Sequence, residues 1–188
     1  TTPKVSVSLS STAEANVSGL FDRFRAANVL QFVQVLYPRD EPNLPDWRNC
    51  MAYMPQAVSL VRHVAASYPE LSGVKIGVIY YDDGVYPSPE LFDILGVDNY
   101  PAKSSILAPG GAYANLTARL APAQQTWVVP GGSYGQDPTP FVNYAQTNPD
   151  VFAVVPFLWA DLNGETGIRS IPAMRSAYTS AGLSIINP

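Results

Sequence analysis

The sequence has few of the residues that build metal centres, disulfides and nucleic-acid surfaces. Its 188 residues include one cysteine, Cys50, and one histidine, His63, so no internal disulfide can form and neither a metal site nor a cofactor is expected. Charged residues make up 14% of the chain, the net charge is −4, and no run of Lys or Arg occurs. We therefore expect no nucleic-acid partner, because binding to phosphates requires a basic surface. No apolar stretch is long enough for a membrane span.

Proline, tyrosine and apolar residues are plentiful instead. The chain contains 18 prolines and 11 tyrosines, and 47% of its residues are hydrophobic. This content is enough to bury one sizeable core, and residues 1–188 are most simply a single domain. Few charges combined with many tyrosines and prolines favour a secreted or periplasmic protein.

Apolar, strand-like runs alternate with helix-like segments along the whole chain. We expect Pro55 to kink or restart the longest helix and Gly182 to cap the last one. Strands are predicted at 4–11, 30–38, 74–84, 96–100, 125–132 and 151–161, and helices at 14–28, 46–69, 88–95, 111–121, 137–149 and 170–182. About six βα units predict an α/β fold with a parallel sheet, either closed into a barrel or open and doubly wound.

Polar and aromatic side chains follow the C-terminal ends of the predicted strands. In a parallel sheet these ends lie on one side, which carries the functional sites of both barrels and open α/β sheets. Carboxylates can act there as acid, base or nucleophile, and aromatic rings stack on sugar rings, so we expect a carbohydrate ligand. The residues that gather there are Asp40, Glu41, Asp82, Asp83, Asp98, Asn99 and Asp161, with Tyr37, Tyr81, Tyr100, Tyr134 and Trp159.

These strand ends make the sequence resemble the later part of a TIM-barrel glycoside hydrolase, from the third strand to the eighth. "YPRDEPN" is similar to the end of a fourth strand, where such enzymes often carry an acid/base Glu after Asp or Asn. "FDILGVDNYP", "TWVVPGGSYG" and "VVPFLWAD" resemble the sixth, seventh and eighth strands. The resemblance implies a barrel that is incomplete at its N-terminus, because a full barrel typically needs about 250 residues. It also implies an N-terminal segment or a partner chain that completes the barrel.

The resemblance singles out two carboxylates. Glu41 is the candidate general acid, and Asp98, which ends an otherwise apolar strand, is the candidate base or nucleophile. Nearby acids would raise the pKa of Glu41 by like-charge repulsion, as a general acid requires. The supporting residues are Asp40, Asp82 and Asp83, and the substrate-binding residues are Tyr37, Tyr81, Asn99, Tyr100, Tyr134 and Trp159.

Several of these residues also have a purely structural interpretation. Asp82 and Asp83 precede Gly84, which is typical of a tight turn, and Asp98 followed by Asn99 is typical of a turn cap. Asp40 would orient Glu41 or pair with Arg39, and Asp161 would cap the loop that follows it.

Three functions remain open from the sequence alone. The first is a glycoside hydrolase-like protein that acts on an oligo- or polysaccharide. The second is a non-catalytic carbohydrate-binding or assembly protein on a degenerate barrel. It is favoured by the segment that resembles a seventh strand, where many such hydrolases carry a nucleophilic Glu and this chain has Pro130-Gly131-Gly132-Ser133. The third is an open α/β sheet that binds a small ligand. In a barrel, strands 4–11 and 151–161 would each present a free edge, which predicts a partner chain or a dimer.

Overall fold

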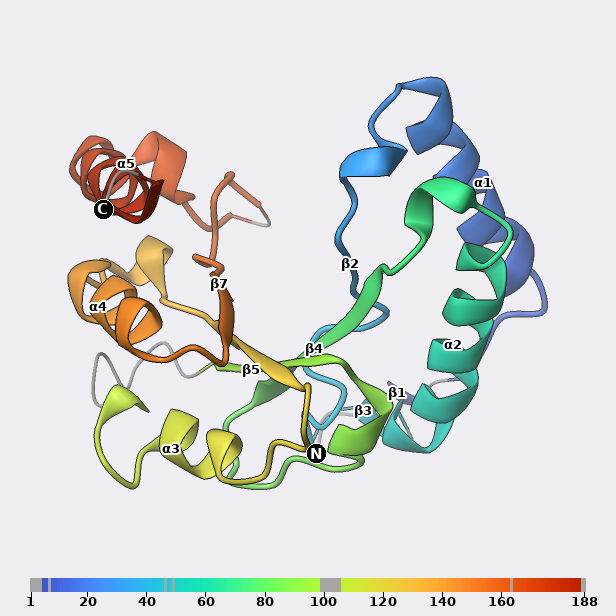
Figure 1. The fold of residues 1–188 in the computed structure, drawn as a ribbon, viewed down its shortest axis with the longest axis horizontal. Coiled ribbons are helices and arrows are strands. Elements are labelled where there is room, and N and C mark those ends of the chain that lie inside the picture. Colours follow the sequence, from blue (N-terminus) through green and yellow to red (C-terminus); the bar gives the residue numbers. More distant parts are fainter. Residues whose placement is uncertain are drawn as a thin grey trace. The chain divides into compact units, whose positions relative to one another are not determined.

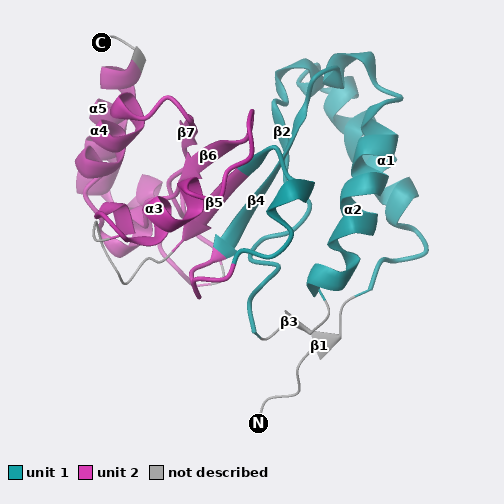
Figure 2. Cartoon of the chain, turned by 60° about the horizontal axis from the view of Figure 1, so that its bottom comes forward, with its two compact units in different colours: residues 1–80, 86–94 teal, residues 81–85, 95–188 magenta. Residues whose placement is uncertain are grey.

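The protein is described from a computed structural model. The structure describes residues 5–6, 8–45, 47–48, 50–98, 106–162 and 164–186. The chain divides into two compact units, unit 1 (residues 1–80 and 86–94) and unit 2 (residues 81–85 and 95–188), which Figure 2 shows in teal and magenta. Strands alternate with helices in both units, so the predicted α/β class is confirmed (Figure 1). A single domain over residues 1–188 stays a prediction.

Unit 1 contains a short parallel strand pair and two long helices. β2 (Val35–Leu36) pairs with β4 (Lys75–Tyr81). α1 (Ala13–Ala26) and α2 (Cys50–Ala65) lie side by side on one face of this pair (Figures 1 and 2). The core of the unit is an apolar cluster made of Phe21, Leu30, Val64, Ala65, Tyr68 and Leu71.

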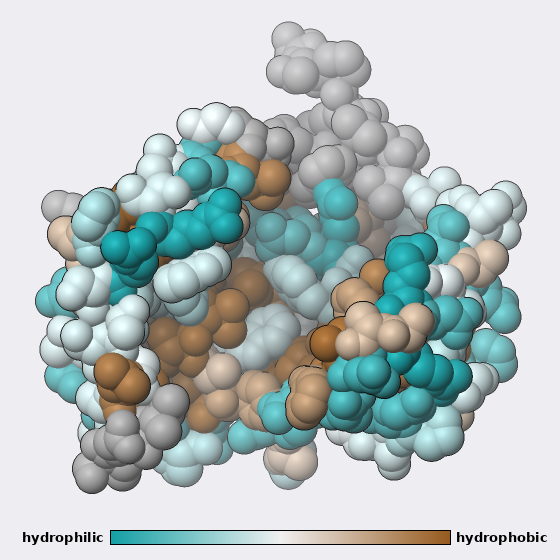
Figure 3. Space-filling model, turned by 90° about the horizontal axis from the view of Figure 1, so that it is seen from above, coloured by the Kyte–Doolittle hydropathy of each residue, from teal (hydrophilic) through white to brown (hydrophobic). Residues whose placement is uncertain are grey.

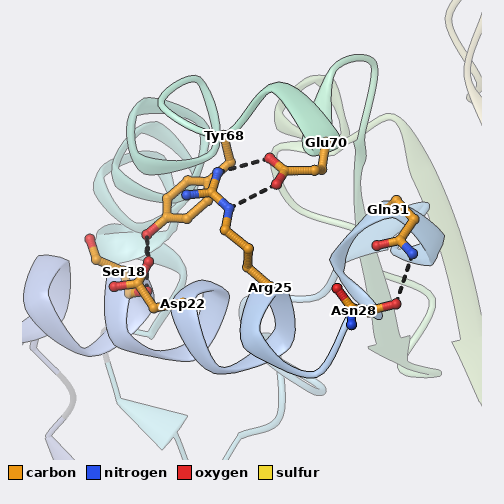
Figure 4. Close-up of polar contacts among 7 residues, drawn as sticks. All are labelled: Ser18, Asp22, Arg25, Asn28, Gln31, Tyr68 and Glu70. Carbon is orange, nitrogen blue, oxygen red and sulfur yellow. Dashed lines mark hydrogen bonds and ion pairs between the residues drawn. The ribbon is translucent and has the colours of Figure 1, made fainter.

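Arg25 joins α1 to the segment that follows α2. Its guanidinium donates two hydrogen bonds of 2.8 Å to the two carboxylate oxygens of Glu70, and it lies 4.4 Å from the centre of the Tyr68 ring (Figure 4). The Tyr68 hydroxyl donates to the Ser18 carbonyl oxygen and to Asp22 Oδ1. The fork-shaped contact and the ring stacking both depend on the planar guanidinium.

We expect Arg25→Lys to lower the urea midpoint of unfolding by roughly 0.2–0.5 M at about pH 7. The reason is that an ammonium group can neither donate two parallel hydrogen bonds to Glu70 nor stack on the Tyr68 ring. The hydrogen bonds from Arg25 hold the pKa of Glu70 below its usual value of 4.5. A lowered folded-state pKa stabilises the protein above the unfolded-state pKa, and this stabilisation is lost as the pH falls through the folded-state value. The difference between the variant and the wild type should therefore shrink at about pH 3, and equal midpoints at neutral pH would contradict the contact.

Unit 2 contains three neighbouring strands in the order β5, β6, β7, of which β6 and β7 are parallel. β5 is buried along its whole length, whereas every residue from Val151 to Leu158 is only half-buried. Within the described residues β7 pairs only with β6, as we predict for an end strand. The elements are β5 (Ile94–Asp98), α3 (Ala112–Thr117), β6 (Gln125–Val128), α4 (Thr139–Thr147), β7 (Val151–Val154) and α5 (Pro172–Ile186).

Two predicted strands near the N-terminus are much shorter than expected. Of residues 4–11, only β1 (Val5–Ser6) is a described strand, and it pairs in parallel with β3 (Trp47–Arg48) in a separate sheet. Residues 4–11 are therefore not an end strand of the larger sheet, as expected for a barrel, and among the described strands β2 is the first in the order of that sheet. The run 30–38 begins with a 3-10 turn at Leu30–Phe32, whose Leu30 fills the core of unit 1.

Three helix predictions also need correction. The expected helix at 88–95 is a 3-10 turn at Pro89–Leu91, because Ser88 has a φ of +51° and makes no capping bond, and the apolar residues that follow enter β5. Helix 46–69 is shorter, and α2 runs through Pro55, which removes only one helical N–H. α5 continues past Gly182 to Ile186, so Gly182 is not a cap. No described helix is both long and apolar enough to cross a membrane.

Gly182→Ala should stabilise the protein by about 0.5–1 kcal/mol, because a helical glycine costs backbone entropy that alanine does not. A Cβ at this position would meet no atom within 4 Å. Gly132→Ala is the opposite case, since its Cβ would lie 2.2 Å from Ile168 Cδ1 and 3.0 Å from Tyr178 Cε2. Urea unfolding should give a higher free energy of unfolding than in the wild type for Gly182→Ala and a lower one for Gly132→Ala. A fall for Gly182→Ala would contradict the helical conformation at this residue.

Candidate functional site

Glu41 lies just beyond β2 in a backbone conformation that is uncommon for a side chain of its kind. Its φ is +42°. Its N–H donates to the Ile79 carbonyl oxygen of β4 at 3.1 Å, and its own carbonyl oxygen accepts from the Leu44 N–H at 3.0 Å. Non-glycine residues rarely adopt positive φ, and such conformations cluster at functional sites. The main chain therefore fixes Glu41 at the C-terminal end of β2.

Asp40 and Tyr37 hold each other beside Glu41. The Tyr37 hydroxyl donates a hydrogen bond to Asp40 Oδ1, and Asp40 forms an isolated parallel bridge with Ile79. Tyr37 also lines an apolar cavity of about 300 Å³ between α1, α2 and β2. The structure thus brings together the predicted residues of unit 1, namely an aromatic ring and two consecutive acids, at one strand end.

Asp82 and Asp83 lie in the turn that the sequence suggests. The Asp83 carboxylate accepts a hydrogen bond from the Val85 N–H at 2.8 Å, and Gly84 has a φ of +77°. The turn is closed further by the bond from the Asp83 N–H to the Tyr81 carbonyl oxygen. The Asp83 side chain therefore stabilises this turn, which leaves Asp82 and Tyr81 as the candidate ligand contacts of the segment.

Asp98 ends β5, and it is a buried carboxyl residue, only 4% exposed. Its carbonyl oxygen accepts a hydrogen bond from the Asp82 N–H at 3.3 Å, so the turn and the strand end meet in unit 2. Burying a carboxylate is costly unless polar groups surround it, which makes a buried acid at a strand end a functional candidate. Asn99 and Tyr100, the next two candidates, lie outside the described residues.

Tyr134 follows β6 and packs against Phe157, in the segment after β7. Its ring stacks on Phe157 with 6.5 Å between the ring centres and an angle of 14°. Its hydroxyl donates to Glu165 Oε1 at 3.3 Å, and the side chain is 55% exposed. This exposed, oriented ring is suited to stacking on a sugar. Glu165 lies in the loop after β7 and is an acid that the sequence analysis did not single out.

Trp159 lies on the wall of an apolar cavity of about 220 Å³ between α4, β7 and α5. Val154 and Pro156 of the β7 segment and Ile185 of α5 form other parts of the wall. The space-filling view shows brown, apolar surface beside polar, teal surface on the left, where unit 2 lies (Figure 3). Trp159 is 49% exposed, so its ring can contact a ligand at the mouth of this cavity.

Asp161 caps its loop, in agreement with the structural interpretation of this residue. Its two carboxylate oxygens accept hydrogen bonds from the Gly167 N–H at 2.7 Å and from the Ser170 hydroxyl at 2.8 Å. These bonds stabilise the charged form and lower the pKa of Asp161. Gly167 is required here, because a Cβ would lie 2.4 Å from the Ala160 carbonyl carbon.

Residues 130–133, which follow β6, include no acid, and there is no space for one at Gly132. Gly132 is packed under Ile168 and Tyr178. The Gln136 side chain accepts a hydrogen bond from the Gly131 N–H at 2.7 Å, and the Tyr178 hydroxyl donates to the Gln136 carbonyl oxygen at 3.1 Å. Residues 130–133 after β6 therefore belong to a tightly packed, hydrogen-bonded loop.

Two separate groups of candidate residues result. Unit 1 carries Tyr37, Asp40 and Glu41, and unit 2 carries Tyr81, Asp82, Asp83, Asp98, Tyr134 and Trp159. Across the part of the chain that the structure describes, no three His, Cys, Asp or Glu side chains come close enough to hold a metal ion. Sequence reasoning missed Glu165, because it lies in an irregular loop. It also missed the buried Tyr113, because a tyrosine on an apolar helix face carries no distinctive sequence signal.

Comparison with known proteins supports the fold and leaves the chemistry open. No protein-family model matches the sequence, and no curated protein sequence matches it. The fold is similar to that of a GH39 β-xylosidase from Caulobacter crescentus, with a TM-score of 0.56 and 14% sequence identity. The match covers 86% of this chain and 41% of the xylosidase chain, so this chain spans less than half the length of that protein. The chain therefore has a glycoside hydrolase-like α/β fold that is compatible with part of a TIM barrel.

Proposed function

We propose that this chain is the later part of a glycoside hydrolase-like barrel and acts on an oligo- or polysaccharide. The observation that carries the proposal is the backbone conformation of Glu41. This acid lies at the C-terminal end of β2 with a positive φ, and main-chain hydrogen bonds to Ile79 and Leu44 hold it there. The likeness to a β-xylosidase fold supports it, and so does a second, buried acid at the end of β5, Asp98. Its place of action would be outside the cytoplasm, as the low charge content favours.

In this proposal Glu41 protonates the glycosidic oxygen as the leaving group departs. Asp98 acts as base on a water molecule or as nucleophile. The separation of the two carboxyl groups in the working protein decides the outcome, with about 5 Å for retention and roughly 6.5–9.5 Å for inversion. Tyr81, Tyr134 and Trp159 supply ring faces for the sugar, and Asp82 supplies a hydrogen-bond acceptor.

The test is to assay the purified 188-residue chain against a panel of 4-nitrophenyl glycosides that includes the β-xyloside, together with oligosaccharide binding by calorimetry. Release of nitrophenol that is lost in the Glu41→Gln variant would support the hydrolase. Neither hydrolysis nor binding of any sugar, in a chain shown to be folded, would overturn the proposal.

A non-catalytic carbohydrate-binding protein is the second candidate, and the packing of Gly132 favours it. No acidic side chain fits at that position without displacing Ile168 and Tyr178. A usual retaining mechanism with a nucleophile on this strand would require such an acid. Sugar binding without hydrolysis, unaffected by Glu41→Gln, would identify this function.

We also propose that an N-terminal segment of the protein or a partner chain completes the sheet at its end strands. β7 pairs with β6 alone, and β2 pairs with β4 alone, among the described residues. Half-buried apolar residues along 151–158 leave surface that a further strand would cover. Light scattering should give a mass above the 20.3 kDa of one chain, whereas a stable monomer at that mass would contradict completion by a second chain.

A further inference from the structure

Tyr113 is a fully buried tyrosine whose hydroxyl serves two strands at once. It is the second residue of α3, in unit 2. Its hydroxyl donates to the Val97 carbonyl oxygen at 2.8 Å and accepts from the Val129 N–H at 2.8 Å. Burial raises the pKa of this hydroxyl, and the negative charge of Asp98 acts in the same direction, so the group stays neutral and keeps both bonds.

These two bonds replace a direct contact between neighbouring strands. Val97 belongs to β5, and Val129 directly follows β6, its neighbour in the sheet. In a parallel ladder the N–H of one strand donates directly to the C=O of the next. Here the tyrosine oxygen lies between such a donor and such an acceptor. The hydroxyl therefore joins the two strands while holding their ends one oxygen atom apart.

The two strand ends that the Tyr113 hydroxyl joins lie next to Asp98, the buried acid of unit 2. Asp98 is the residue after Val97, and its carbonyl oxygen is bonded to the Asp82 N–H. We propose that Tyr113 is a positioning residue, whose hydroxyl sets the spacing between the C-terminal ends of β5 and β6 and so fixes the main chain that carries Asp98. The inference rests on the proposed function only for the catalytic role of Asp98.

The test compares Tyr113→Phe with Tyr178→Phe. Both variants remove one buried hydroxyl that donates to a main-chain carbonyl, but the Tyr178 hydroxyl bonds to Gln136. Hydrogen exchange of the Val129 amide should become at least ~10-fold faster in Tyr113→Phe, relative to the Val78 amide, and stay unchanged in Tyr178→Phe. The Asp98 carboxyl, followed by carbon NMR, should titrate at a different pH only in Tyr113→Phe.

Activity gives a third readout that separates the two proposals. If the wild type hydrolyses an aryl glycoside, Tyr113→Phe should lower kcat by ~10-fold with little change in KM, because the base is misplaced and not removed. If the wild type hydrolyses none, the proposed function fails, while exchange and titration still decide the role of Tyr113. The inference would be overturned if, in Tyr113→Phe, the Val129 amide exchanged at the same rate as in the wild type and the Asp98 carboxyl titrated as in the wild type.

A second measurement covers the case in which Tyr113→Phe does not fold. In the wild type, the Tyr113 hydroxyl proton should exchange slowly and show a nuclear Overhauser contact to the Val129 amide. Asp98→Asn should shift the resonance of that proton. A rapidly exchanging hydroxyl proton with no contact to Val129 would overturn the inference as well.

Discussion

Glu41→Gln is expected to lower kcat for glycoside hydrolysis by at least ~100-fold, because an amide cannot protonate the departing oxygen. The substitution keeps the size of the side chain and the main-chain bonds to Ile79 and Leu44, so sugar binding should persist. The loss should be smallest for substrates with a strongly acidic leaving group, such as dinitrophenol, since these depart without protonation. The measurement is kcat and KM for a series of aryl glycosides with different leaving groups.

Glu90→Gln is the matched control, because Glu90 is an exposed glutamate of the same unit that lies in the Pro89–Leu91 turn. Its kcat should equal that of the wild type. If Glu41→Gln reduced the rate equally for every leaving group, Glu41 would not be the general acid. An unchanged rate for all substrates would remove Glu41 from the site altogether.

Phe21→Ala should cost about 3–5 kcal/mol of the free energy of unfolding, because it leaves a cavity in the core of unit 1. Phe21 is 2% exposed and meets the Tyr68 ring edge-on, with 5.2 Å between the ring centres. A typical domain is stable by only about 5–15 kcal/mol, so this variant should be largely destabilised at 37 °C. Urea unfolding followed by circular dichroism measures the loss.

Leu20→Ala is the control for Phe21→Ala, because Leu20 lies one position earlier on the same helix and is 38% exposed. It should cost less than about 1 kcal/mol, since little apolar area is buried there. Equal losses for the two variants would mean that α1 does not present the face on which the core of unit 1 depends.

The sequence predicts those elements best whose pattern agrees with their environment. α1 was expected at 14–28 and spans 13–26, and β4 was expected at 74–84 and spans 75–81. The prediction of one strand over 30–38 is wrong, because the apolar residues of this run do not share one environment. Leu30 is buried in the core, whereas Phe32 is 73% exposed. Ser88 and Pro89 carry a helix-start signal, but positive φ at Ser88 prevents the cap, and burial draws Ile94 and Leu95 into β5.

From the sequence, the candidate site could be predicted only as a group of polar residues at the C-terminal ends of strands. Asp98 is the last residue of β5, and Glu41 follows Asp40, which forms a bridge with Ile79 of β4. The groups that shape their surroundings come from elsewhere, such as Tyr113 from α3 and Glu165 from a loop. Long-range hydrogen bonds of this kind leave no periodic signal. Asp83 shows the converse, since its turn signal correctly indicated a structural role.

The most direct test of the central claim is an amide NMR titration of the folded Glu41→Gln chain with xylo-oligosaccharides and other oligosaccharides. We predict that the amides of Tyr37, Asp40 and residue 41 shift in a saturable way as sugar is added, whereas the amide of the exposed Glu90 in the same unit does not. No shift at the first three residues with any sugar would contradict a carbohydrate site at the C-terminal end of β2.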